Sequence, residues 1–186
     1  SELVSAAVQG FRDKGMICSL KHFPGHGDTK VDSHYDAAYV TKSLDQLRKE
    51  EFLPFKAGID AGADMVMIGH LVVPDIDEVP ATFSHKIVTD ILKNELNFKG
   101  IVITDALNMQ AITNYYDSSS GAIHAVKAGV DILLCPSSLE DSVEALEDAV
   151  RKGDILEERI DESVRKILKL KLQKEIISDN DLSDFQ

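Results

Sequence analysis

The sequence Met-Ile-Cys-Ser-Leu-Lys-His-Phe-Pro-Gly-His-Gly-Asp-Thr-Lys-Val-Asp-Ser-His occupies residues 16–34 and guides the interpretation of the whole chain. Its first five residues are mostly apolar and predict a buried strand over residues 16–20. Pro24, Gly25 and Gly27 then exclude a regular strand or helix, so a polar loop follows. Three of the six histidines of the chain lie in this stretch. A loop that follows a strand of a parallel α/β protein commonly carries the chemistry, and a polar surface loop is the alternative.

The composition narrows the class of protein. The chain has 186 residues, 44% of them hydrophobic, which is enough for one domain with a core. Its net charge of −12 argues against a nucleic-acid partner and against contact with anionic membranes. No apolar run approaches the roughly 18 residues of a transmembrane helix, and no signal peptide is visible. Cys18 and Cys135 lie in apolar runs, and we expect two buried free thiols.

Strand-like and helix-like segments alternate along the chain. Continuous apolar runs predict further strands over residues 63–69, 100–104 and 130–135. Helical periodicity and capping residues predict helices over residues 3–11, 43–53, 84–97, 121–128, 138–150 and 160–168. Strands that are apolar throughout are typical of a parallel sheet covered on both faces. We expect one domain over residues 1–175, followed by an acidic tail or linker over residues 176–186.

Two architectures fit this alternation of parallel βα units. One is a doubly wound sheet, and the other is part of an eight-stranded βα barrel, for which 186 residues are too few. Right-handed crossovers place the carboxyl ends of all the strands at one rim. We therefore expect Lys21, His22, His70 and Asp105 to converge at that rim.

Asp105 is the first candidate for chemistry, because it directly follows the apolar segment Gly-Ile-Val-Ile-Thr. A carboxylate at the end of a buried strand can act as a nucleophile, a base or a ligand. The alternative is that Asp105 caps a short helix over residues 106–111, which is a common position for aspartate.

Asp32 and His34 form the second candidate, since residues two apart in an extended segment point the same way. A carboxylate beside an imidazole raises the pKa of the imidazole, so His34 could donate a proton near neutral pH. A solvated loop histidine is the alternative.

Lys21 and His22 close the first predicted strand. They could donate hydrogen bonds to a substrate, or Lys21 could form a Schiff base in an aldolase or lyase. A metal site built from His22, His26, His34 and Asp28 is a third possibility, although no known ligand spacing supports it.

Three segments together resemble glycoside hydrolase family 3, and in particular its bacterial β-N-acetylglucosaminidases. They are Lys-His-Phe-Pro-Gly-His-Gly-Asp-Thr at 21–29, Asp-Ser-His at 32–34 and Ile-Thr-Asp-Ala-Leu at 103–107. The Asp-x-His loop separates this group from the β-glucosidases of the family. The resemblance covers residues 3–172 and includes Glu-Arg-Ile-Asp-Glu-Ser-Val-Arg-Lys-Ile-Leu at 158–168.

The resemblance implies the second half of a (β/α)8 TIM-type barrel that needs no cofactor or metal. It implies retaining hydrolysis of terminal β-linked N-acetylglucosamine from cell-wall muropeptides or chitin-type oligosaccharides. Asp105 matches the nucleophile, and His34 matches the general acid/base with Asp32 as its partner. Lys21 and His22 match residues that bind the sugar. His70 stands where a rim residue near the sugar is expected.

The resemblance also implies that part of the barrel is absent from this chain. In the family an N-terminal half-barrel precedes this region and supplies further sugar contacts. We therefore expect a piece of a longer protein, or a half-domain completed by a partner chain or by self-association. Phosphorolysis is a variant, because a neutral histidine repels an anionic phosphate acceptor less than a carboxylate does. The resemblance does not assign a cellular compartment, since proteins of this group are cytoplasmic, exported or lipid-anchored.

Overall fold

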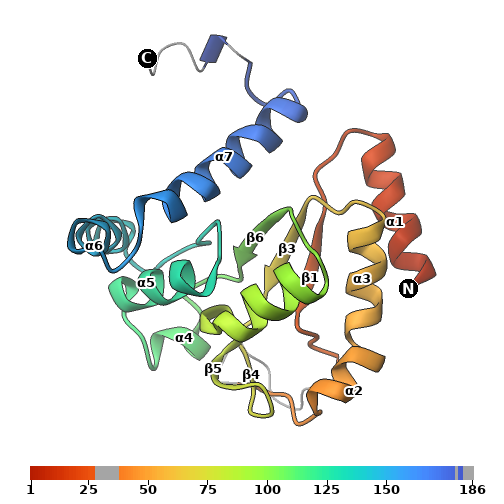
Figure 1. Ribbon diagram of the computed structural model, residues 1–186, viewed down its shortest axis with the longest axis horizontal. Helices are drawn as coiled ribbons and strands as arrows, with labels where there is room; N and C mark the ends of the chain where they lie inside the picture. Colours follow the sequence, from red (N-terminus) through yellow and green to blue (C-terminus); the bar gives the residue numbers. More distant parts are fainter. Residues whose placement is uncertain (28–37, 179, 182–186) are drawn as a thin grey trace.

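A parallel three-stranded sheet forms the centre of the structure. The computed structural model describes residues 1–27, 38–178 and 180–181. The strands β1 (Ser19–Phe23), β3 (Met65–Ile68) and β6 (Ile101–Thr104) lie in the order β1-β3-β6 (Figure 1). A single parallel bridge joins Ile103 to Ile132 beyond β6. The predicted parallel βα arrangement is confirmed, and the strands described do not close a barrel.

A second, smaller sheet lies beyond the carboxyl end of β3. It contains β2 (Ala38–Tyr39), β4 (Leu71–Val73) and β5 (Asp77–Pro80) in the order β2-β4-β5. β2 runs parallel to β4, and β5 runs antiparallel to it. Because β4 follows β3 after two residues, the small sheet extends the rim at which β3 ends.

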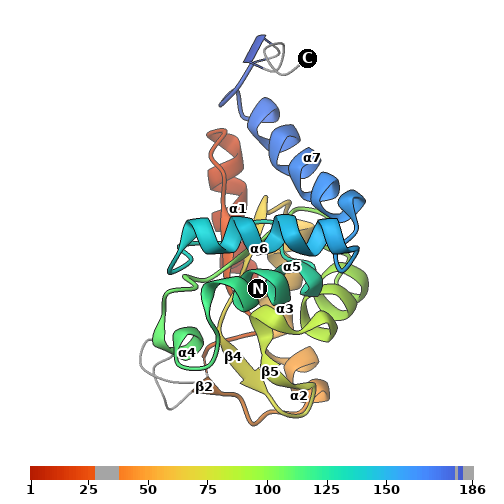
Figure 2. The ribbon, with the colours of Figure 1, turned by 90° about the vertical axis from the view of Figure 1, so that its left-hand side faces the viewer.

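Helices surround the central sheet (Figure 1). They are α1 (Glu2–Asp13), α2 (Leu44–Lys49), α3 (Phe52–Asp60), the 3₁₀-helix η1 (Ala81–Phe83), the π-helix η2 (Lys86–Glu95), α4 (Gln110–Thr113), α5 (Ser118–Ala128), α6 (Leu139–Lys152) and α7 (Glu157–Gln173). α1 packs on α3, and α6 lies across α5, as Figure 2 shows. Within the described ranges, no helix combines the length and apolar character needed to cross a membrane.

Local capping signals explain where two of the helices begin. The Ser43 hydroxyl accepts a hydrogen bond from the Gln46 N–H at 3.3 Å, and the Gln46 side chain accepts from the Ser43 N–H at 2.8 Å. Ser138 accepts from the Asp141 N–H at 3.2 Å at the start of α6. Such caps satisfy backbone donors that the first helical turn leaves without partners. Both predicted helix starts are confirmed.

The hydrophobic core holds the end of β1 in place. Phe23 is fully buried, with its ring centroid 5.3 Å from that of Phe52 and 5.1 Å from that of Phe55. Large aromatic side chains contribute much of the stabilisation of a core because they bury a large apolar area. The strand end that carries Lys21 and His22 is therefore fixed from behind by α3.

Two predicted strands differ from those observed. The first begins at Ser19 rather than residue 16, because Met16 lies in the exposed connection after α1 and is 54% exposed. Lys21 and His22 consequently lie inside β1. Residues 130–135 form no strand beyond the bridge at Ile132. There the Asp131 carboxylate, not a backbone carbonyl, accepts the Val102 N–H.

The two cysteines have different surroundings. Cys18 is buried as predicted, whereas Cys135 is exposed, and neither forms a disulfide. The prediction for Cys135 was wrong because the residue leaves the sheet region with a φ of +45° in place of extending a strand.

Candidate active site at the strand ends

Asp105 lies at the rim, directly after β6. Its N–H donates to the Ile68 carbonyl at 2.9 Å, which ties it to the end of the neighbouring strand β3. Its Oδ1 accepts the Ala106 N–H at 2.8 Å. The alternative role as a helix cap for residues 106–111 is wrong, because the next helix, α4, begins only at Gln110. The carboxylate is 19% exposed and is thus reachable from the rim.

His22 faces Asp105 across the end of β3. Its Nε2 lies 3.5 Å from Oδ2 of Asp105, and its side chain is 25% exposed. Gly69, at the end of the intervening strand, leaves room for this approach, since an added Cβ would lie 3.1 Å from Cβ of His22. The structure thus brings together two of the side chains expected at the rim.

The segment around His22 has an unusual backbone. The Lys21–His22 and Phe23–Pro24 peptide bonds are both cis, and the Gly25 N–H donates to the His22 carbonyl at 2.9 Å. Gly25 has a φ of +128°, a conformation that favours glycine. The Lys21 side chain is exposed. A Schiff-base lysine is normally activated by burial, so the structure gives the lyase alternative no support.

His70 is buried beneath the Asp105 segment, with 1% of its surface exposed. Its Nε2 lies 2.9 Å from the Ala106 carbonyl, and its Nδ1 lies 2.8 Å from Oγ1 of Thr82. Burial is the main cause that lowers the pKa of His70, which favours the neutral ring. Because a carbonyl only accepts, the proton of the neutral ring belongs on Nε2. His70 therefore supports the backbone beside Asp105, and a direct sugar contact stays a prediction.

The proposed acid/base pair cannot be placed. Asp32 and His34 lie outside the described residues, as does Asp28 of the alternative metal site. Among the residues that the structure does describe, no group of three or more histidine, cysteine, aspartate or glutamate side chains is arranged to hold a metal ion. The roles of Asp32 and His34 stay predictions.

Sequence reasoning missed two polar groups that shape the molecule. Thr82 supports His70, but it comes from the 3₁₀-helix η1, twelve residues further on, and no local sequence signal marks it. The second is Asp131, whose fully buried carboxylate accepts the Val102 N–H at 2.9 Å and the Ser163 hydroxyl at 2.7 Å. A charged residue inside the apolar run 130–135 was the available signal.

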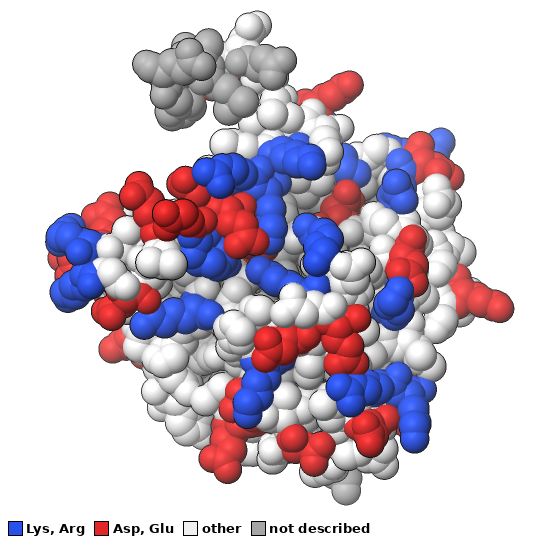
Figure 3. All heavy atoms as spheres, viewed as in Figure 1, with Lys and Arg blue, Asp and Glu red and all other residues white. Residues whose placement is uncertain are grey.

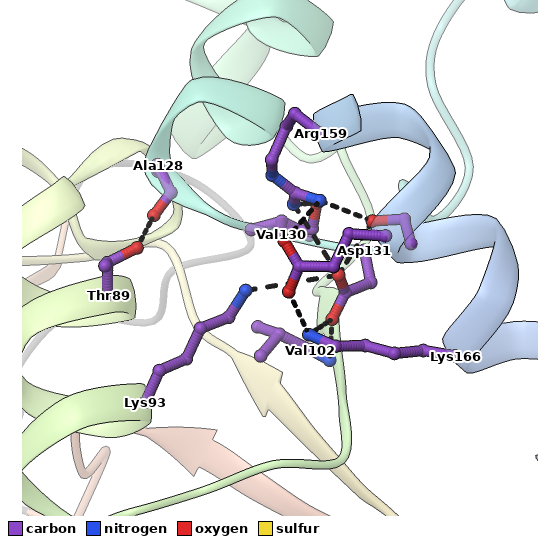
Figure 4. A network of polar contacts seen from close by, with 10 residues as sticks. Thr89, Lys93, Val102, Ala128, Val130, Asp131, Arg159 and Lys166 are labelled. Carbon is purple, nitrogen blue, oxygen red and sulfur yellow. Dashed lines mark hydrogen bonds and ion pairs between the residues drawn. The ribbon is translucent and has the colours of Figure 1, made fainter. Parts of the chain in front are cut away.

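Cations from two helices surround Asp131 (Figure 4). Arg159 and Lys166 of α7 lie 3.6 Å from its oxygens, and Lys93 of η2 lies 4.0 Å away. Arg159 also donates to the Val130 carbonyl at 2.6 Å. These contacts fasten α7 to the start of β6.

Comparison with known proteins defines the family. Residues 1–170 match the model of the glycosyl hydrolase family 3 N terminal domain. The chain therefore belongs to glycosyl hydrolase family 3, as its motifs predict. β-Hexosaminidase A of Pseudoalteromonas piscicida is 34% identical over 92% of this chain and 32% of its own length. A β-hexosaminidase of Xylella fastidiosa is 40% identical over 76% of this chain and 43% of its own length.

Solved structures agree with this assignment. A family 3 β-N-acetylglucosaminidase from a Paenibacillus species superimposes with a TM-score of 0.89 at 40% identity, over 92% of this chain and 34% of that one. A β-glucoside phosphorylase superimposes with a TM-score of 0.87 at 25% identity, over 92% of this chain and 33% of that one. The chain thus spans less than half the length of these relatives.

Proposed function

We propose that this chain carries the catalytic residues of a retaining β-N-acetylglucosaminidase. The observation that carries the proposal is the Asp105 carboxylate, which is held at the strand end by the Ala106 N–H and faces His22 at 3.5 Å. The position of the carboxylate at the carboxyl end of a barrel-type strand is typical of catalytic residues. The assignment of N-acetylglucosamine as the sugar is supported by relatives named β-hexosaminidase and β-N-acetylglucosaminidase.

The mechanism is a double displacement. Asp105 attacks the anomeric carbon while the bond to the leaving oxygen breaks, and His34 gives that oxygen a proton. The product is a covalent glycosyl-enzyme in which the sugar is bonded to Asp105. In the second step His34 takes a proton from water, the water attacks the anomeric carbon, and the bond to Asp105 breaks. Asp32 favours the protonated imidazole that the first step needs.

The remaining rim residues bind the sugar and position Asp105. Lys21 and His22 donate hydrogen bonds to sugar hydroxyls, as polar groups at a strand end can do. His22 also fixes the Oδ2 side of Asp105, whereas the Ala106 N–H fixes the Oδ1 side. A carboxylate held from both sides loses little freedom when it attacks.

The activity belongs to a longer protein in this proposal. The chain covers about a third of the length of β-hexosaminidase A. In this proposal, the N-terminal half-barrel that the family resemblance implies completes the sugar site. The substrates are cell-wall muropeptides or chitin-type oligosaccharides that end in β-linked N-acetylglucosamine. The competing proposal is that this half-barrel serves only in assembly. That proposal would be supported if no complete form of the protein turned over a sugar.

Release of nitrophenol from nitrophenyl β-N-acetylglucosaminide tests the proposal. It is measured for the chain alone and for the chain joined to the N-terminal half of a β-hexosaminidase relative. Asp105→Asn should abolish release from whichever form is active. Asp60→Asn, at an exposed ion pair on α3, is the matched control and should leave release unchanged. Full activity of Asp105→Asn would remove Asp105 as the nucleophile.

Phosphorolysis is a second candidate, favoured by the structural likeness to a β-glucoside phosphorylase. An acid/base that is neutral after the first step repels a phosphate dianion less than a carboxylate does. Adding phosphate to the same assay should then give N-acetylglucosamine 1-phosphate. If the free sugar is the sole product at high phosphate concentration, hydrolysis is the reaction.

A further inference from the structure

A cavity of about 400 Å³ opens between η2, the end of α5 and α7. Cationic side chains dominate its wall, as Figure 3 shows where blue side chains gather between α7 and the yellow-green helix η2 of Figure 1. The charged residues of the wall that matter here are Lys93, Lys99, Lys127, Arg159, Lys166 and Glu162. Such a concentration of positive charge is unexpected on a chain whose net charge is −12.

The contacts within the cavity leave much of this positive charge uncompensated. Two carboxylates, the buried Asp131 and Glu162, pair with Lys93, Arg159 and Lys166, and Lys166 lies 2.8 Å from Glu162. Lys93 comes no closer than 4.0 Å to Asp131. Lys99 and Lys127 are exposed and form no ion pair with any residue in the described ranges.

The pKa of Lys93 is shifted by burial first and then by the charges around it. Burial lowers its pKa to about 8, and the nearby positive charges of Lys166 and Arg159 act in the same direction. Asp131 and Glu162 act in the opposite direction but do not restore the ordinary value. An anion in the cavity would stabilise the charged form of all these side chains, because opposite charges attract most strongly where water is partly excluded.

We propose that this cavity binds a tetrahedral dianion, either inorganic phosphate or the phosphate group of a phosphomonoester. The site is separate from the catalytic rim. Val102, whose N–H is bonded to Asp131, lies near the start of β6, whereas Asp105 follows its end. A bound dianion would link Lys93 and Lys99 on the η2 side to Lys127 on α5 and Arg159 and Lys166 on α7.

Titration with sodium sulfate tests the proposal without any need for catalysis. Amide shifts of Lys93, Gly129 and Lys166 are followed by NMR in the ¹⁵N-labelled chain at constant ionic strength. We expect saturable shifts confined to these walls. Lys99→Gln and Lys127→Gln should each weaken binding about threefold, as expected for exposed charges. Lys14→Gln, an exposed lysine outside the cavity, is the control and should bind like the wild type.

Three further ligands identify the chemistry. Inorganic phosphate and glycerol phosphate distinguish the two forms of the dianion. If inorganic phosphate binds and glycerol phosphate does not, the ligand is the free anion rather than a phosphomonoester. Acetate is the monoanionic control, and equal shifts with acetate would overturn the preference for a dianion. Absence of saturable shifts with sulfate, or equal weakening by Lys14→Gln, would overturn the site itself.

The pH dependence offers an independent check. Sulfate keeps two charges from pH 6 to 9, so a fall in its affinity between pH 7 and 9 reports the loss of a protein proton. We expect such a fall, and Lys93→Met should remove it. The charged and titratable groups that face Lys93 are His85, Lys99, Lys127, Asp131, Arg159, Glu162 and Lys166. A fall that persists in Lys93→Met would exclude Lys93 as its origin.

Discussion

Replacing Asp131 with asparagine tests the buried network that fastens α7 to the sheet. The asparagine side chain has the same shape but no charge, and it carries one oxygen where aspartate has two. The carboxylate now accepts the Val102 N–H at 2.9 Å through Oδ2 and the Ser163 hydroxyl at 2.7 Å through Oδ1. In the variant, the amide NH₂ must therefore face one of these two donors.

The expected loss follows from burial. The Asp131 side chain has no exposed surface, and Arg159, Lys166 and Lys93 rely on it as a buried counter-charge. Removing one partner of a buried ion pair lowers stability by about 3–5 kcal/mol. Lys166 keeps Glu162 as a second partner, so we expect a loss near the lower end, about 3 kcal/mol.

Urea unfolding followed by far-UV circular dichroism measures this loss. The slope of the free energy of unfolding against urea concentration should stay unchanged, while the urea concentration at the midpoint of unfolding falls. Asp161→Asn is the matched control, because its exposed ion pair with Arg165 at 3.0 Å should contribute below about 0.5 kcal/mol. In 1 M salt the Asp131 effect should persist, since buried pairs are screened little. Equal small losses for both variants would refute the reasoning.

Three other changes probe separate parts of the structure. Burial lowers the pKa of Lys93 to about 8, whereas an unfolded lysine titrates near 10.4. Between about pH 8 and 10 the unfolded chain binds more protons, so this group makes stability rise with pH. Urea unfolding at three pH values should show that rise reduced in Lys93→Met but kept in Lys99→Met. Thr82→Val removes the partner of His70 Nδ1, and thermal unfolding should show a loss of about 1–2 kcal/mol. In the complete protein the same variant should lower kcat more than it changes KM, and wild-type kinetics would contradict a positioning role. His34→Ala should slow natural linkages far more than aryl glycosides with good leaving groups, which need little protonation. Equal losses on both substrates would argue against the acid role.

Much of the rim was predictable from sequence because its signals are local. An apolar run that ends in Asp105 places a carboxylate at a strand end, whatever the rest of the chain does. The register of β1 was not predictable in the same way. Lys21 and His22 are polar although they lie inside the strand, and Met16 is apolar although it lies outside the strand.

Contacts between distant segments could not be read from the sequence. Thr82 meets His70 only because β4 and β5 turn the chain back on itself. The interruption at residues 130–135 has a similar origin, since Asp131 is held by side chains of η2 and α7. Periodicity detects apolar runs, but it does not show which polar group will replace a backbone partner.

The most direct test of the account is to find the covalent bond to Asp105. The complete protein is treated with an activated fluoro-sugar glycoside of N-acetylglucosamine, which slows hydrolysis of the intermediate, and its peptides are analysed by mass spectrometry. We predict one added sugar on the peptide that contains Ile-Val-Ile-Thr-Asp, and its loss in Asp105→Asn. A sugar attached to another residue, or inversion at the anomeric carbon in the product, would contradict the account.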